Sequence, residues 1–172
     1  VAMSLGITAP AYAATSGHLI FGAGVTGDCK NNLAIASWAG KDATATGTTA
    51  LAIGTSATGT GDNTIALGTS ARATIKQAVA VGNEANASQE NAIALGTGAQ
   101  AKGISSISIG AGNDVSGNNS GAIGDPTTIT GSGSYSVGNN NNISVDNTFV
   151  LGSEVTANVA DSVYLGKGST AS

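Results

Sequence analysis

Side chains that could support catalysis or bind a ligand are few and scattered in this chain of 172 residues. The chain has a single histidine, His18, and a single cysteine, Cys29, so it cannot supply a zinc cluster, and its repeated part lacks a histidine base. His18 is interpreted as a polar residue of an N-terminal cap. Cys29 has no partner within the chain, and it either remains a free thiol or pairs between chains.

Two short motifs resemble ligand-binding loops. Gly22–Gly27 (GAGVTG) matches the dinucleotide fingerprint G-x-G-x-x-G, which requires a following helix and an acidic residue about 20 positions later. An alternating strand pattern follows instead, so a glycine-rich loop is the better interpretation. Ile109–Asp114 (IGAGND) resembles a calcium-binding nonapeptide, but such sites need nine-residue units stacked on one another. We therefore predict no enzyme activity, no cofactor and no metal.

The amino-acid composition excludes further classes of protein. Only 9% of the residues are charged and 3% are aromatic, which argues against an ordinary globular core. The six basic residues are scattered and the net charge is −4, so no nucleic-acid footprint exists. No apolar run reaches the roughly 18 residues that a membrane-spanning helix needs.

A repeat of 14 residues organises the rest of the chain. Its core is Ile93-Ala94-Leu95-Gly96, and the final glycine returns nine times without a slip, as Gly54, Gly68, Gly82, Gly96, Gly110, Gly124, Gly138, Gly152 and Gly166. Within the unit, hydrophobicity alternates with period two, first in Ile93–Leu95 and again in Ala99-x-Ala101. One unit thus reads strand, corner, short strand, corner, with the glycine at a corner. Stacked units predict an all-β parallel solenoid with turns about 4.8 Å apart.

The columns of the repeat predict which residues face the interior of the coil and which face outward. The large aliphatic residues, such as Ile93 and Leu95, are expected to fill the inside of the coil. The small residues between them are expected to face outward and to be buried against another chain. This predicts a cyclic self-association through Ala52, Ala66, Ala80, Ala94, Ser108, Ala122 and Ser136.

Three segments are expected along the chain. Residues 1–13 resemble the end of a secretory signal, with the pattern Ala11-x-Ala13 before a cleavage point. Residues 14–39 are expected to form an N-terminal cap and an irregular first turn, in which Leu33–Ala36 lies four residues out of phase, as an insertion would produce. Trp38 either plugs the end of the coil or is an exposed binding contact. Residues 40–172 are the repeats.

The repeats resemble the head of YadA-like trimeric autotransporter adhesins, whose unit is N-S-V-A-I-G-x-x-S-x-A. The resemblance is carried by NTIALGTSARA from Asn63, QAVAVGNEANA from Gln77 and NAIALGTGAQA from Asn91. It implies a left-handed parallel β-roll that forms a homotrimer on the bacterial surface. In the family the head is carried by a neck, a coiled-coil stalk and a C-terminal outer-membrane anchor, none of which is found in this sequence. Gly121, Tyr135, Val150 and Tyr164 depart from the repeat pattern.

The resemblance also implies a function. Such heads bind collagen, fibronectin, other host matrix or cell-surface ligands, or other bacteria, and no individual contact residue is predicted here. The alternative is a structural spacer without a ligand of its own. Acyltransferases with a left-handed β-helix are disfavoured, because their repeat has six residues and they use a catalytic histidine. Ice binding is disfavoured as well, because threonine recurs mainly at corners, as at Thr55, Thr69 and Thr97, and no T-x-T file is recognised.

Overall fold

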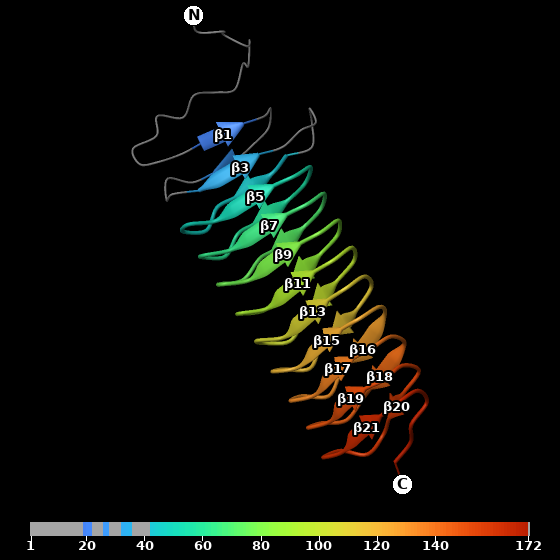
Figure 1. Cartoon of the computed structure of the whole chain (residues 1–172). Helices are drawn as coiled ribbons and strands as arrows, with labels where there is room; N and C mark the ends of the chain where they lie inside the picture. Colours follow the sequence, from blue (N-terminus) through green and yellow to red (C-terminus); the bar gives the residue numbers. More distant parts are fainter. Residues whose placement is uncertain (1–18, 22–25, 28–31, 36–41, 172) are drawn as a thin grey trace, which may run out of the picture.

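The computed structural model describes residues 19–21, 26–27, 32–35 and 42–171. Those residues form a parallel β-solenoid in which two stacks of short strands run along one rod, with no helix among them (Figure 1). The predicted signal remnant 1–13, His18, Cys29 and Trp38 lie outside the described residues, as does most of the Gly22–Gly27 loop.

Each turn of the solenoid contributes one strand to each of two sheets. Sheet A has 11 strands: β1 (Leu19–Phe21), β3 (Leu33–Ile35), β5 (Leu51–Ile53), β7 (Ile65–Leu67), β9 (Val79–Val81), β11 (Ile93–Leu95), β13 (Ile107–Ile109), β15 (Gly121–Ile123), β17 (Tyr135–Val137), β19 (Phe149–Leu151) and β21 (Val163–Leu165). Sheet B has 10 strands: β2 (Thr26–Gly27), β4 (Thr44–Ala45), β6 (Thr58–Gly59), β8 (Arg72–Ala73), β10 (Asn86–Ala87), β12 (Gln100–Ala101), β14 (Asp114–Val115), β16 (Thr127–Ile129), β18 (Asn141–Ile143) and β20 (Thr156–Ala157).

The strand register confirms the period and the predicted irregularity. Ile93 pairs with Ile107, 14 residues later, and this offset holds for every pair of sheet A from β5 to β21. Leu33 instead pairs with Leu51, 18 residues later, so one turn carries four extra residues. β1 is already in the same sheet, because Leu19 pairs with Leu33. The regular sheet pairing therefore begins before residue 40.

The predicted facing of sheet A is wrong. The small residues of the column between the large ones point into the solenoid and are almost fully buried there: Ala52, Ala66, Ala80, Ala94, Ser108, Ala122 and Ser136 are 0–1% exposed within the single chain. They are not available to a neighbouring chain. The large residues on either side, such as Ile93 and Leu95, face outward and are partly exposed. The physical reason is that sheets A and B pack closely and leave room between them for alanine from both sides.

Inner volumes are matched across the two sheets. In the turns from Ala66 to Ala101 every buried residue of the core cluster is alanine. Farther along, the inner residue of sheet B grows to Ile129 and Ile143, while sheet A offers Ala122 and Ser136. The relation then reverses.

The reversal occurs in the last turns. Sheet A supplies Val150 and Tyr164, and sheet B returns to Ala157. Tyr164 is 1% exposed, and its hydroxyl oxygen accepts hydrogen bonds from the backbone N–H groups of Asn158 (3.3 Å) and Val159 (3.2 Å). These departures from the repeat pattern therefore fill the interior.

The closing glycines stack on one another where the strands of sheet A end. Eight of the nine have φ between 97° and 140°, a region that side chains rarely adopt. A Cβ atom at Gly96 would lie 2.3 Å from the carbonyl oxygen of Gly110 in the next turn. Backbone conformation and close stacking therefore both require glycine there.

Polar side chains link the corners of successive turns. The backbone N–H of Thr48 donates to Asp62 Oδ1 (2.7 Å), and the same 14-residue step joins Ile104 N–H to Asn118 Oδ1 (2.9 Å) and Ser132 N–H to Asp146 Oδ1 (2.8 Å). At the following position of this corner the chain adopts positive φ, from Thr49 (60°) to Asp161 (56°). Asparagine tolerates this conformation, which explains its frequency in the corners.

Two buried asparagines occupy a corner column that is alanine in earlier turns. Asn141 Nδ2 donates to Ser136 Oγ (2.9 Å) and to the Gly152 carbonyl (2.7 Å), and its Oδ1 accepts from Val155 N–H (2.9 Å). Asn113 Nδ2 donates to the carbonyls of Ile109 and Gly124, both at 2.9 Å, whereas its Oδ1 has no partner among the described residues.

We predict that Asn141→Ala lowers the free energy of unfolding more than Asn113→Ala. The first change leaves the buried Val155 N–H and the Gly152 carbonyl unpaired, at a cost of about 2–3 kcal/mol, and the second should cost about 1 kcal/mol. Urea unfolding followed by circular dichroism measures both. Equal losses would contradict the hydrogen-bond assignment.

Candidate interaction surface

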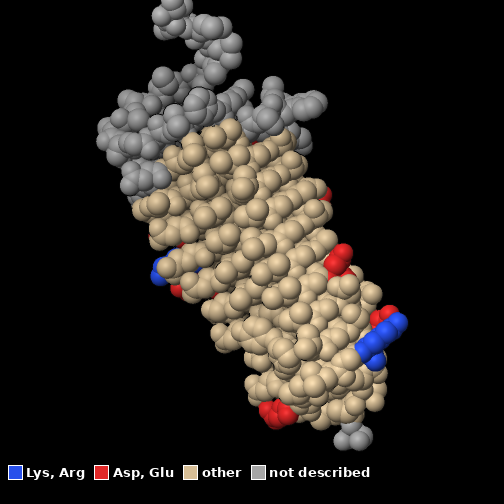
Figure 2. Space-filling model, in the orientation of Figure 1, with Lys and Arg blue, Asp and Glu red and all other residues tan. Residues whose placement is uncertain are grey.

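The outer face of sheet A carries two parallel files of large apolar side chains. Along the rod, the positions of Ile93 and Leu95 are filled in the other turns by leucine, isoleucine, valine, tyrosine or phenylalanine, with Gly121 as the one exception from β5 to β21. The strands of sheet A contain no charged residue. In the view of Figure 2, charged side chains appear only at the margins of the solenoid. We call these two files the apolar face.

Exposed apolar side chains of the described residues concentrate there. Of the twelve large hydrophobic residues that are well exposed, nine lie on sheet A: Ile65, Leu67, Ile123, Tyr135, Val137, Phe149, Leu151, Val163 and Leu165. A contiguous apolar surface of this kind is unusual on a monomeric protein and marks an interaction site.

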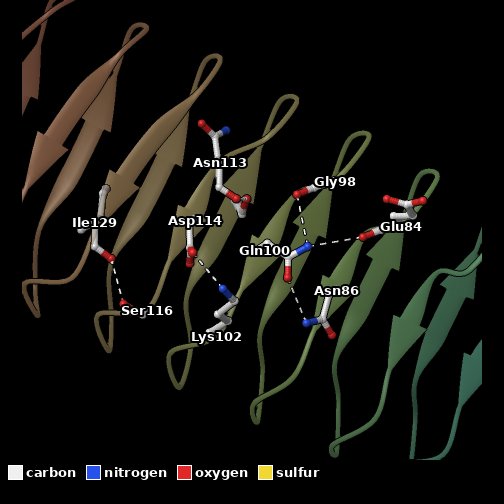
Figure 3. Close-up of polar contacts among 10 residues, drawn as sticks. Glu84, Asn86, Gly98, Gln100, Lys102, Asn113, Asp114, Ser116 and Ile129 are labelled. Carbon is white, nitrogen blue, oxygen red and sulfur yellow. Dashed lines mark hydrogen bonds and ion pairs between the residues drawn. The ribbon is translucent and has the colours of Figure 1, made fainter.

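The outer face of sheet B is polar. Its central file contains threonine, asparagine and glutamine together with Arg72 and Asp114. Neighbouring turns are joined by side chains, since Asn86 Nδ2 donates to Gln100 Oε1 (3.1 Å) and Gln100 Nε2 donates to the carbonyls of Gly98 (3.2 Å) and Glu84 (3.4 Å) (Figure 3). Lys102 Nζ lies 2.8 Å from Asp114 Oδ2. Many of these polar groups thus satisfy one another.

Threonine forms a short file on sheet B, contrary to the expectation from the sequence. Thr44 and Thr58 are register partners on sheet B, and each is followed two residues later by another threonine, Thr46 and Thr60. A T-x-T file therefore does exist, but it spans two turns and ends where Arg72 pairs with Thr58. Two turns provide little flat threonine surface, so ice binding gains no support.

Charged groups do not gather into a site within the described residues. The ion pairs found there are Lys76–Glu90 (3.6 Å), Lys102–Asp114 (2.8 Å) and Lys167–Glu154 (3.0 Å), whose side chains are 39–71% exposed, so that each pair is of small energetic value. No group of three or more His, Cys, Asp or Glu side chains in the described part could hold a metal ion. Nor does that part contain a helix long and apolar enough to cross a membrane.

The geometry defines a class: a β-solenoid fibre segment with one apolar and one polar outer face. The YadA head domain repeat (2 copies) matches the chain in overlapping windows at residues 39–57, 45–71, 60–85 and 76–99. YadA head domain repeats are thus detected over residues 39–99, which supports a YadA-like head domain there. No curated protein matches the chain.

YadA head domains as a family have known general properties. YadA head repeats are typical of non-enzymatic, surface-exposed fibres of the autotransporter adhesin class, and YadA heads form trimers. The solenoid continues beyond residue 99 with the same 14-residue offset up to β21. The later turns therefore extend the same rod.

The large residues of the apolar face were expected inside the solenoid, and the structure places them outside. A signal for the correct side is present in the sequence. Where sheet B changes from Ala101 to Val115 and Ile129, the small column of sheet A stays small, and where that column becomes Tyr164, sheet B has returned to alanine. Such volume compensation identifies two columns that share one interior.

Proposed function

We propose that the chain is the head of a bacterial surface adhesin that attaches to host matrix, host cells or other bacteria as a homotrimer. The observation that carries this proposal is the apolar face, which runs in register along sheet A and would be costly to leave in water. The predicted left-handed winding and an outer-membrane anchor outside this chain belong to the same proposal by family resemblance.

The trimer would place the three apolar faces around a common axis. Each face has a uniform column structure and no charge, so three copies can meet in parallel with identical residues at each level. Covering a large aliphatic side chain that is already partly buried stabilises by about 1 kcal/mol, and each turn supplies two such side chains in most of the rod. The sum over the rod is ample for stable assembly.

A charge-insertion pair tests this arrangement. Leu67→Asp combined with Leu95→Asp should leave the strand content unchanged but abolish assembly at micromolar concentration, because two carboxylates per chain would have to be desolvated. The matched control is Thr58→Asp with Asn86→Asp, which adds the same charge to the outer face of sheet B and should leave assembly intact. If both variants sediment like the unchanged chain, the apolar face is not the interface.

Attachment would then use the surface that the trimer leaves open, namely the outer face of sheet B and the corners. A rod of repeated turns, with three copies at each level, offers many weak copies of a contact and gains by avidity. We expect purified trimers to bind at least one of immobilised collagen, fibronectin or whole bacteria, and to lose that binding when the assembly is disrupted.

A structural spacer is the second candidate. It is favoured by the internal pairing of polar groups on sheet B, where Asn86 bonds to Gln100 and Lys102 to Asp114. Trimers that give flat binding responses on every matrix protein and on bacteria would support the spacer and overturn the adhesive role.

A further inference from the structure

Most turns of the rod present equivalent side chains on the apolar face. From β5 to β13 each turn presents two aliphatic side chains, so sliding one copy by a single turn, about 4.8 Å, would exchange like for like. Repetitive interfaces of this kind specify alignment weakly unless some position differs from the rest.

The file changes abruptly at three consecutive register partners. Gly121 follows Ile107, Tyr135 pairs with Gly121, and Phe149 pairs with Tyr135. A Cβ atom at Gly121 would lie 2.9 Å from both Cδ1 and Cε1 of Tyr135, so the ring covers the glycine, which is buried although it lies on the outer side of the sheet. We call this sequence of residues the aromatic step.

The aromatic step remains accessible to a neighbour. Tyr135 is 42% exposed and Phe149 is 41% exposed. The Tyr135 ring lies over the level of Gly121 as well as its own, so one side chain takes the place of the two that the regular turns present. This stretch of the apolar face therefore differs in shape from the aliphatic turns, and close packing against identical copies requires that shape to be matched.

We propose that the aromatic step fixes the axial alignment of the copies that associate through the apolar face, a proposal that rests on the self-association argued above. In aligned copies the three steps meet at one level, with each ring beside its own counterparts. In copies shifted by one turn, Tyr135 lies at the level of a neighbour's Gly121 or Phe149. The mismatch of glycine and aromatic ring then leaves a void at one level and a clash at the next.

The test compares the chain with a variant in which the file is made regular: Gly121→Val, Tyr135→Ile and Phe149→Val. In a Cys29→Ser background, tagged chains carrying Ile93→Cys are co-assembled with untagged chains carrying Ile107→Cys, and oxidative cross-linking is measured. Position 107 lies one turn after position 93, so a tagged–untagged cross-link reports a shift by one turn. Chains that all carry Ile93→Cys report aligned copies.

We expect aligned cross-links alone in the otherwise unchanged chain, and shifted cross-links at a level similar to aligned ones in the regular variant. The matched control, Ile65→Val with Val79→Ile, changes the aliphatic part of the file and should keep the alignment. Sedimentation without cysteines gives a second measurement, with one species expected for the unchanged chain and a broad distribution for the regular variant.

Two results would overturn the proposal and are distinguishable. If the regular variant assembles and yields aligned cross-links alone, the aromatic step does not set alignment, while self-association stands. If the unchanged chain does not assemble at all, the proposed trimer fails and the alignment proposal falls with it.

Discussion

Gly96→Ala should lower the free energy of unfolding by about 3 kcal/mol or more, the largest loss that we expect from adding a single methyl group to this chain. Gly96 has φ of 132°, and its added Cβ would lie 2.3 Å from the Gly110 carbonyl oxygen and 2.7 Å from the carbonyl carbon. Relief requires the two turns to separate, which breaks the strand pairing on which a solenoid depends. Urea unfolding followed by circular dichroism gives the value.

Two control variants separate the causes of that loss. Gly98 has φ of 65° and no atom within 4 Å of its virtual Cβ, so Gly98→Asn should cost about 1 kcal/mol or less. Gly166 has φ of 97° and also no atom within 4 Å, so Gly166→Ala shows the conformational cost without stacking. If Gly96→Ala lowers the free energy of unfolding no more than Gly98→Asn does, close stacking of the closing glycines is not what requires glycine at position 96.

Ala94→Leu should be the second strongly destabilising change, with a loss of about 3 kcal/mol. Ala94 is 0% exposed inside the solenoid, between Ala80 and Ser108, which are also 0% exposed. Three extra carbon atoms cannot be accommodated between sheets spaced for alanine, so the strand content itself should fall. Circular dichroism and urea unfolding at a fixed chain concentration measure this.

The control for this change is Thr128→Leu, which puts the same side chain at an exposed position on the outer face of sheet B and should alter stability by less than about 0.5 kcal/mol. The result also decides the facing of sheet A. If Ala94 pointed outward into an interface, Ala94→Leu would leave each chain folded and disrupt only assembly. A folded monomeric variant would therefore contradict the structure described here.

Much of the fold could be predicted from the sequence because the repeat constrains it. Nine glycines in phase and two short alternations per unit predicted two strands and two corners per turn. The phase shift at Leu33 predicted the four extra residues that the pairing of Leu33 with Leu51 confirms. The repeat length and the strand positions can be predicted without knowing which side of each strand faces the interior.

Periodicity could not show which residues of sheet A face the interior. Alternation shows that two sets of residues face opposite ways, but not which set is inside. The prediction relied on the ordinary rule that large apolar side chains are buried. That rule fails here because the interior of most of these 14-residue turns holds small residues, so Ile93 and Leu95 face outward and remain partly exposed. The large Val150 and Tyr164 lie in the same interior cluster as Ala157 of sheet B, and this compensation of volumes identifies the inner side.

In the proposed trimer, two sister copies cover the apolar face of each chain. Sedimentation equilibrium of the unchanged chain, over a range of concentrations, tests it most directly. We predict a mass three times that of one chain, maintained on dilution to the low micromolar range. A single compact species with the mass of one chain at the highest concentration would rule out the proposed trimer.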